Sequence, residues 1–326
     1  MKKKLIKFLT AGVIGLGVLS ASPVALAQAA YPTEVVRVIV GQAPGGSTDI
    51  IARIATARLS EILGKPVIVE NRTGAAGSLA AEYVSKAKPD GHTLLLASSS
   101  FSINPAISKL AFDPKKDLKP VTLLAEAPFI LVTRPDFPAK SAQDLLKMAA
   151  QKRIKYASGG VGSSGHMAGE LLEDLSGLKM LHVPYKGAGP ALNDVVAGHV
   201  DILFASVLSA TPFIESGKLK PLAVSTAKRI RAQPSVPTLA EAGVANYRNS
   251  TWYGVLAPAG TPDALVERIS SAFKEAVLSE KVSKILLADG AEPAGTSPND
   301  FRAMLHGEMD KWVELVKKME VSGMKN

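Results

Sequence analysis

Short apolar segments rich in β-branched residues alternate with segments of helical period along most of this sequence, and this alternation limits the fold more than any other feature. Strands that alternate with helices form parallel sheets covered by helices on both faces. Ligands of such sheets bind beyond the carboxyl ends of the strands. The expected strands are residues 35–40, 67–69, 93–97, 154–157, 181–183, 202–204 and 219–224. The expected helices are residues 48–63, 78–86, 141–152, 164–175 and 188–196.

The length of the chain favours two domains. Two longer amphipathic segments, residues 262–278 and 298–319, are expected to be helices that brace the first domain. We expect the chain to cross between domains near residues 129–133 and 251–257. Lobe 1 would then comprise residues 28–130 and 254–326, and lobe 2 would be residues 131–253, an insertion of about 120 residues.

The N-terminus has the pattern of a secretory signal peptide. Four lysines precede or flank an apolar stretch, and Ala25-Leu26-Ala27 is a small-residue cleavage site, which predicts a signal peptide of residues 1–27 cut before Gln28. The apolar stretch is shorter than the roughly 20 residues that span a bilayer. Without residues 1–27 the 38 basic and 29 acidic residues become 34 and 29, a net charge of +5, with no basic cluster of the kind that binds nucleic acid.

The loop after the first expected strand is a candidate site for an anion. Pro44, Gly45 and Gly46 allow a bend with free N–H groups, and Ser47, Thr48 or Asp49 can cap the helix that follows. Free N–H groups at the positive end of a helix attract a carboxylate. An ordinary strand-to-helix turn with a cap is the alternative.

A second loop of this kind runs from Ser158 to His166, and Gly160, Gly162 and Gly165 have the spacing of a dinucleotide-binding motif. The acid that would hold the ribose is missing after the next strand, which argues against a dinucleotide. Ser158, Ser163 and Ser164 remain as donors to a carboxylate. Two such loops on two domains would face one another across a cleft and hold a ligand with two carboxylates, or with a carboxylate and a carbonyl.

Other polar residues follow expected strands at the same edge. Ser98, Ser99 and Ser100 close one strand, and the residue among them that meets the ligand is left open. Tyr185 and Lys186 follow another strand, and Ser206 follows Ala205 after a third. Lys186 either attracts an anion at the rim or is a solvated loop charge.

Histidine and serine residues raise the question of catalysis. The G-x-S-x-G elbow of serine hydrolases is absent around Ser163 and Ser164, so we interpret His166 as a packed or capping residue. The chain has no cysteine, and its histidines show no metal-ligand spacing. We therefore expect no catalytic residue, no metal and no cofactor, with an exported serine hydrolase as the rival hypothesis.

Ordered motifs along nearly the whole mature chain resemble those of the tripartite tricarboxylate transporter substrate-binding proteins, also called Bug receptors. The matching motifs are Pro44-Gly45-Gly46-Ser47-Thr48-Asp49, Val69-Glu70-Asn71-Arg72-Thr73-Gly74-Ala75-Ala76-Gly77, Pro89-Asp90-Gly91-His92-Thr93-Leu94-Leu95, Gly162-Ser163-Ser164-Gly165-His166, His182-Val183-Pro184-Tyr185-Lys186-Gly187, Gly217-Lys218-Leu219, Val236-Pro237-Thr238, Trp252-Tyr253-Gly254 and Ala257-Pro258-Ala259-Gly260-Thr261-Pro262.

The resemblance implies an α/β fold of two lobes, the type II or "Venus flytrap" fold of periplasmic binding proteins, each lobe a mostly parallel sheet flanked by helices. It implies a periplasmic, monomeric receptor that closes on a small carboxylate and docks, when closed, on integral membrane transporter subunits. A sensor subunit that presents its ligand to a signalling partner is a further possibility. Many members carry Asp where this chain has Ala205, which favours a dicarboxylate or aromatic carboxylate without an amine.

Overall fold

The computed structural model describes residues 31–288 and 290–318, and the predicted signal peptide with its cleavage site lies outside them. The strands are β1 (Val36–Val40), β2 (Val67–Asn71), β3 (Thr93–Ser98), β4 (Leu118–Thr133), β5 (Lys155–Ser158), β6 (Leu181–Pro184), β7 (Ile202–Ser206), β8 (Lys220–Val224), β9 (Ser250–Pro258) and β10 (Glu292–Pro293). Every segment that the sequence predicts to be a strand overlaps one of these, with starts that differ by at most one residue.

The helices follow the predicted alternation and add four that the sequence did not indicate, which are the short 3-10 helix η1 and the α-helices α3, α7 and α9. They are α1 (Ser47–Leu63), η1 (Ala75–Gly77), α2 (Ser78–Ser85), α3 (Ser100–Ile107), α4 (Ala142–Ala149), α5 (Ser164–Ser176), α6 (Ala188–Ala197), α7 (Val207–Glu215), α8 (Asp263–Leu278), α9 (Glu280–Ala288) and α10 (Pro298–Lys318).

The strands form two groups that share β4. The main order is β2-β1-β3-β9-β4-β7-β5-β6, with β8 and β10 also paired to β4. β1 pairs in parallel with β2 and β3, and β5 pairs in parallel with β6 and β7. The pairs made by β4 and β9 are all antiparallel, so each group combines a parallel part with antiparallel crossing strands.

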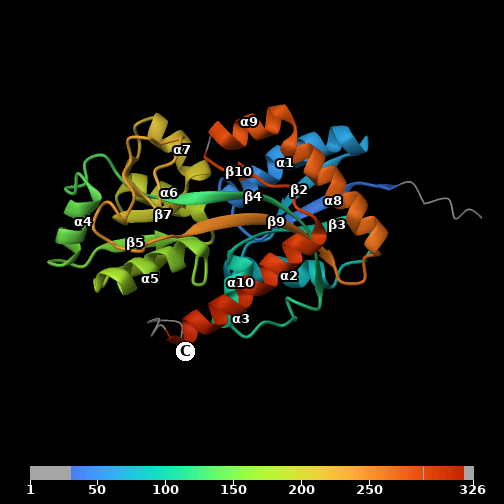
Figure 1. Cartoon of the computed structure of the whole chain (residues 1–326), viewed down its shortest axis with the longest axis horizontal. Coiled ribbons are helices and arrows are strands. Elements are labelled where there is room, and N and C mark those ends of the chain that lie inside the picture. The colour runs from blue at the N-terminus through green and yellow to red at the C-terminus, as the bar shows by residue number, and fades with distance from the viewer. Residues whose placement is uncertain (1–30, 289, 319–326) are drawn as a thin grey trace, which may run out of the picture. The chain divides into compact units, whose positions relative to one another are not determined.

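β4 runs through both groups, and β9 lies beside it (Figure 1). Residues 118–128 of β4 pair with β9, whereas Phe129 to Thr133 pair with β7 and β8. The chain returns beside this point, where the Asn249 N–H donates to the Ser225 carbonyl and the Ser225 N–H donates to the Phe129 carbonyl (both 2.9 Å). We call the β1–β3 side lobe 1 and the β5–β7 side lobe 2. The residues at which the lobes divide stay a prediction.

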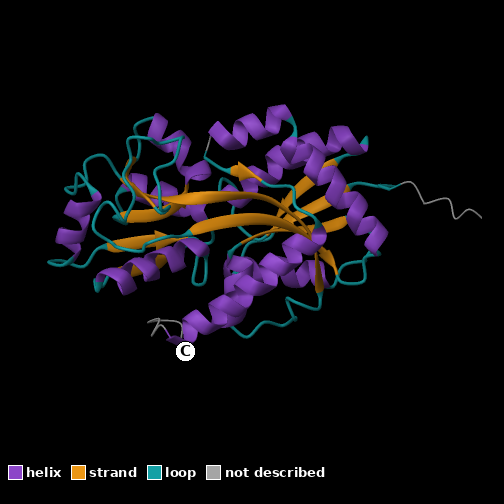
Figure 2. Ribbon diagram, viewed as in Figure 1, coloured by secondary structure: helices purple, strands orange, loops and turns teal. Residues whose placement is uncertain are grey.

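Helices lie on both sides of the strands (Figure 2). In lobe 2 the alternation of side chains explains this: Ile202 and Phe204 face one apolar cluster with α5, while Leu203 and Ala205 face another with α6. In lobe 1, α8 and α10 pack on β4, as the predicted brace requires. Among the described residues no helix is long and apolar enough to cross a membrane.

Candidate ligand-binding site

Asp49 shapes the loop between β1 and α1. Its carboxylate accepts the Gly45 N–H (3.1 Å) and the Asn71 amide (3.0 Å), and it pairs with Arg53 (2.9 Å). Burial opposes the charge of Asp49, but these hydrogen bonds and the Arg53 charge outweigh it and lower the pKa of Asp49. Gly45 has a positive φ of 81°, which glycine favours, whereas Gly46 at the helix cap has φ −75°. Asp49, which the sequence suggested as a cap at this candidate anion site, therefore uses its carboxylate to hold the loop in shape.

Behind this loop lies a chain of polar side chains. The Gln42 amide donates to Ser98 Oγ (3.2 Å), and the Thr48 hydroxyl donates to Gln42 Oε1. These three residues line a small cavity of about 20 Å³, which is room for a single water molecule. Ser98, which the sequence predicted to be a site residue, is thus linked to the loop through hydrogen bonds with Gln42.

The neighbouring serines have different partners. Ser99 Oγ lies 2.9 Å from Oγ1 of Thr251 on the crossing strand β9. Ser100 Oγ accepts the Ser164 N–H of lobe 2 (3.2 Å). Among the three serines that the sequence left open, Ser100 is therefore the one that contacts the opposite loop.

The second loop caps α5. Ser163 is the N-cap residue, and its hydroxyl accepts the His166 N–H (3.2 Å). The Ser163 N–H in turn donates to the Gly160 carbonyl (3.0 Å). His166 is buried, and its Nδ1 accepts the Gly162 N–H (3.2 Å), which confirms the interpretation of His166 as a packed and capping residue.

The two lobes touch at these loops. The Ala43 N–H donates to the Lys186 carbonyl (3.3 Å). A side chain added at Gly187 would come within 2.8 Å of the Ala43 nitrogen, and one at Gly189 within 2.5 Å of the Pro44 carbonyl oxygen. The backbone of residues 43–44 therefore contacts the backbone of residues 186–189, and the two lobes are closed in this structure.

Buried hydroxyl groups lie close together near the contact between α1 and α7. The first residues of these helices are Ser47 and Val207. Tyr253 of β9 points its hydroxyl toward Ser47, Ser206 and Thr251. Within the described residues, neither Tyr253 Oη nor Ser206 Oγ has a hydrogen-bond partner, although both residues are almost completely buried. Burial raises the pKa of Tyr253 to about 12, so its hydroxyl keeps its proton and can donate it.

The remaining predicted residues lie apart from this cluster. The Tyr185 hydroxyl donates to Asp194 (2.6 Å), and the Lys186 side chain is exposed. Pro44 is also exposed. The Ala205 side chain packs in an apolar cluster with Ile130, one residue before Ser206. The ligand contacts predicted for these residues stay predictions.

Comparison with known proteins agrees with this architecture. A family model described as the tripartite tricarboxylate transporter family receptor matches residues 51–321. The chain belongs to this receptor family. Protein BugT of Bordetella pertussis is 33% identical over 312 residues, which are 94% of this chain and 96% of BugT.

Solved structures similar to this receptor share its two-lobed fold. The periplasmic binding protein BugD is 32% identical with a TM-score of 0.85, covering 88% of this chain and 98% of BugD. Rpa4515 of R. palustris, solved with adipate, is 34% identical with a TM-score of 0.85, covering 88% of this chain and 97% of its own. MatC of Rhodopseudomonas palustris, solved with bound malate, is 33% identical with a TM-score of 0.82. The match covers 88% of this chain and 100% of MatC.

One serine of the receptor does touch a histidine. Ser158 Oγ lies 2.6 Å from His182 Nε2 and also accepts the Gly160 N–H (3.1 Å). Burial, and then the facing His166 ring, lower the pKa of His182 to about 3, against the attraction of Glu170. A histidine with so low a pKa is a weak general base, and the Ser158 side chain is buried. The pair fits a structural role better than the rival hydrolase hypothesis.

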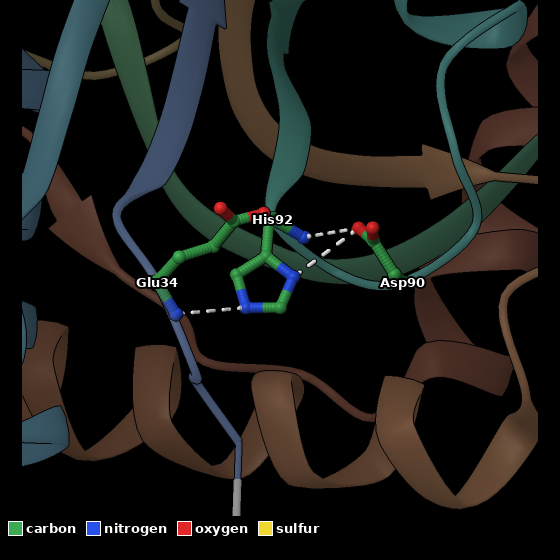
Figure 3. Close-up of side chains that lie close together, drawn as sticks. All are labelled: Glu34, Asp90 and His92. Carbon is green, nitrogen blue, oxygen red and sulfur yellow. Dashed lines mark hydrogen bonds and ion pairs between the residues drawn. The ribbon is translucent and has the colours of Figure 1, made fainter.

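Glu34, Asp90 and His92 lie close together at the other end of β1 and β3 (Figure 3). Asp90 Oδ1 lies 3.2 Å from Nδ1 of His92, and Nε2 of the same ring accepts the Thr33 N–H (3.1 Å). One ring nitrogen therefore contacts the segment before β1 and the other contacts Asp90 before β3, and a metal ion would have to displace one of these contacts.

Sequence reasoning missed Tyr253 and Thr251 as members of the site. Both lie on β9, whose residues were assigned to a crossing between lobes. The signal was present in the motif Trp252-Tyr253-Gly254, since a tyrosine in a buried strand needs a partner for its hydroxyl.

Proposed function

We propose that the protein is a periplasmic solute-binding receptor that captures a small dicarboxylate lacking an amine and delivers it to a tripartite tricarboxylate-type membrane transporter. The observation that carries the proposal is the pair of buried hydroxyls, Tyr253 and Ser206, that have no partner where α1 and α7 meet. An unpaired buried hydroxyl costs free energy, which a ligand oxygen would recover.

The surroundings of this pair favour an anion. The N-termini of α1 and α7 both carry a partial positive charge, and their first N–H groups have no partner within the helix. A carboxylate placed there would accept the Tyr253 and Ser206 hydroxyls, one from each side of the contact. The second carboxylate would lie toward the loop before α5, which Ser164 brings against Ser100.

The absence of a free acid supports a ligand without an amine. Among the predicted site residues, all of which the structure describes, Asp49 alone carries a carboxylate, and Arg53, Asn71 and the Gly45 N–H occupy it. A buried ammonium group would therefore lack a charged partner, which costs several kcal/mol. The solved relatives with adipate and malate hold amine-free dicarboxylates.

The family description and the predicted signal peptide support the proposed delivery to a membrane partner. Closure brings residues of both lobes, such as Ala43 and Lys186, to one surface. We propose that the transporter subunits bind this closed form of a monomeric receptor.

Tyr253→Phe tests the proposal. The change removes a hydroxyl that has no protein partner, so we expect the free energy of unfolding to stay the same or rise slightly. Calorimetric titration with adipate, malate and glutarate should show at least a tenfold loss of affinity, about 1.4 kcal/mol.

Tyr247→Phe is the matched control, because the Tyr247 hydroxyl is equally buried but donates to the Ala168 carbonyl (2.7 Å). We expect that variant to lose about 1 kcal/mol of stability and to keep its affinity. Equal affinities of wild type and Tyr253→Phe would refute the assigned site, and consumption of the bound ligand would favour the hydrolase.

A further inference from the structure

The side of α5 that faces β5 and β6 carries a chain of buried polar groups that the proposed function does not use. Glu170 lies one turn after His166 on α5, and Tyr156 lies on the neighbouring β5. Glu170 Oε1 accepts the Tyr156 hydroxyl (2.7 Å) and lies 3.3 Å from His166 Nε2. The His166 ring stacks on His182 with 3.9 Å between centroids.

These contacts fix which nitrogen of His166 carries the proton. Burial opposes the charge of Glu170, but hydrogen bonds from His166 and Tyr156 outweigh it and lower the pKa of Glu170. An ionised carboxylate only accepts, so Nε2 of His166 must donate to it. Nδ1 is then bare, and it accepts the Gly162 N–H at 3.2 Å.

The bond from His166 is the hydrogen bond that holds the Gly162 N–H, while Gly160, Ser163 and Ser164 have partners of their own. Gly160 and Gly162 both have positive φ, at 122° and 77°. Gly162 also packs against the other lobe, since an added side chain there would meet Ile107 at 2.1 Å. Two residues further on, the Ser164 N–H reaches Ser100 across the lobes.

We propose that Glu170 and His166 are positioning residues, which set the proton position on the imidazole and thereby hold residues 160–164 in the conformation that meets lobe 1 and the ligand. The part of this inference that concerns the ligand rests on the proposed function. Neither residue touches the ligand in this arrangement. They act through the backbone of Gly162.

A pair of variants separates the two hydrogen bonds of His166. In His166→Asn the side-chain oxygen lies as many bonds from Cα as Nδ1 does, so it can still accept the Gly162 N–H. In His166→Gln the amide nitrogen corresponds to Nε2, so it can donate to Glu170 but leaves the Gly162 N–H without its acceptor. Both variants lose the stacking on His182, so each serves as the other's control for packing.

The exchange rate of the Gly162 amide proton, measured by NMR in ligand-free protein, reports directly whether its hydrogen bond is kept. We expect exchange in His166→Gln to be at least tenfold faster than in His166→Asn. Affinity for adipate should fall at least tenfold in His166→Gln and stay within threefold of wild type in His166→Asn. Equal exchange in the two variants would overturn the inference.

Glu170→Gln tests the proton position itself. Its amide can donate to Nε2, which would move the imidazole proton to Nδ1 and set it against the Gly162 N–H. Nitrogen-15 spectra of the His166 ring should show Nε2 protonated in wild type and Nδ1 protonated in the variant. A wild-type ring protonated at Nδ1 would refute the proposal. These readings need no ligand, so a wild type that binds no carboxylate would refute only the proposed function.

Discussion

His182 is kept neutral by its surroundings in lobe 2. Its pKa is lowered to about 3 by burial and by the adjacent His166, and Ser158, Tyr156 and Glu170 are the other groups that face it. In the unfolded chain His182 takes up a proton near pH 6.5, whereas in the folded protein His182 does so only near pH 3. The stability that depends on neutral His182 is therefore complete above about pH 6.5 and falls as the pH is lowered toward 3.

His182→Gln should remove this dependence and keep the contact with Ser158, because its amide reaches the place of Nε2. Urea unfolding at pH 7 and pH 5 measures the effect. We expect wild type to lose about 2 kcal/mol more than the variant between these pH values. Equal losses would show that other groups cause the acid sensitivity.

Single residues also show where prediction from sequence ends. The sequence identified Asp49 and Ser163 as polar groups at helix N-termini, and both lie there. Their side chains, however, accept hydrogen bonds from their own loops, the Gly45 N–H and the His166 N–H. Capping residues and ligand-binding residues are of the same types and lie at the same helix N-termini. Only the coordinates show whether the side-chain oxygen already accepts a hydrogen bond from the protein backbone.

The contact between α6 and the first loop depends on a glycine in the first turn of that helix. A side chain at Gly189 would lie 2.5 Å from the Pro44 carbonyl oxygen, and backbone cannot yield as a flexible side chain does. We expect Gly189→Ala to keep the fold, because alanine favours helix, but to hold the lobes apart and weaken adipate binding at least tenfold.

Gly307→Ala is the control for the helical effect. Gly307 lies in α10 with no atom within 4 Å of an added Cβ, so the variant should gain about 1 kcal/mol in stability with unchanged affinity. Calorimetry and thermal unfolding of both variants give the comparison. Unchanged affinity in Gly189→Ala would show that binding does not require this contact.

The elements that the sequence missed have identifiable causes. β4 begins at Leu118, yet only its last residues were predicted, because Pro120 and Pro128 argue against a strand interior. α3 and α7 are short and contain Pro105 and Pro212. Their helices follow from packing against β3, β4 and α10 rather than from local preference.

Among the residues that the structure describes, two hydrogen bonds cross the site between the lobes. They are Ala43 N–H to the Lys186 carbonyl and Ser164 N–H to Ser100 Oγ, each worth about 1 kcal/mol net. Closure without ligand is therefore weakly favoured at best, and a ligand that binds both sides shifts the population. Small-angle scattering should give a smaller radius of gyration at saturating adipate than without it. An unchanged radius would contradict this closing step.

The alternation of strands and helices predicted the lobe architecture well, since each parallel unit is encoded locally. The pattern could not predict the closed arrangement of the lobes, because closure depends on contacts between residues far apart in the sequence, such as Gly162 and Ile107. The motif Trp252-Tyr253-Gly254 signalled that the Tyr253 hydroxyl needs a partner, but its position near Ser47 and Ser206 depends on segments that are distant in the sequence.

The sharing of β4 has a consequence for how relatives of this chain can diverge. The first part of β4 already has register shifts, between Pro120 and Thr122 and between Leu123 and Ala125, where an extra residue can be absorbed in a bulge. Side chains alternate along a strand, so the insertion or loss of one residue after these shifts would turn all later side chains of β4 to the opposite face. Such a change would exchange the faces of Ile130 and Leu131, which belong to different apolar clusters of lobe 2. We therefore expect length variation among homologues to be tolerated in the surface loops and excluded from this later part of the strand.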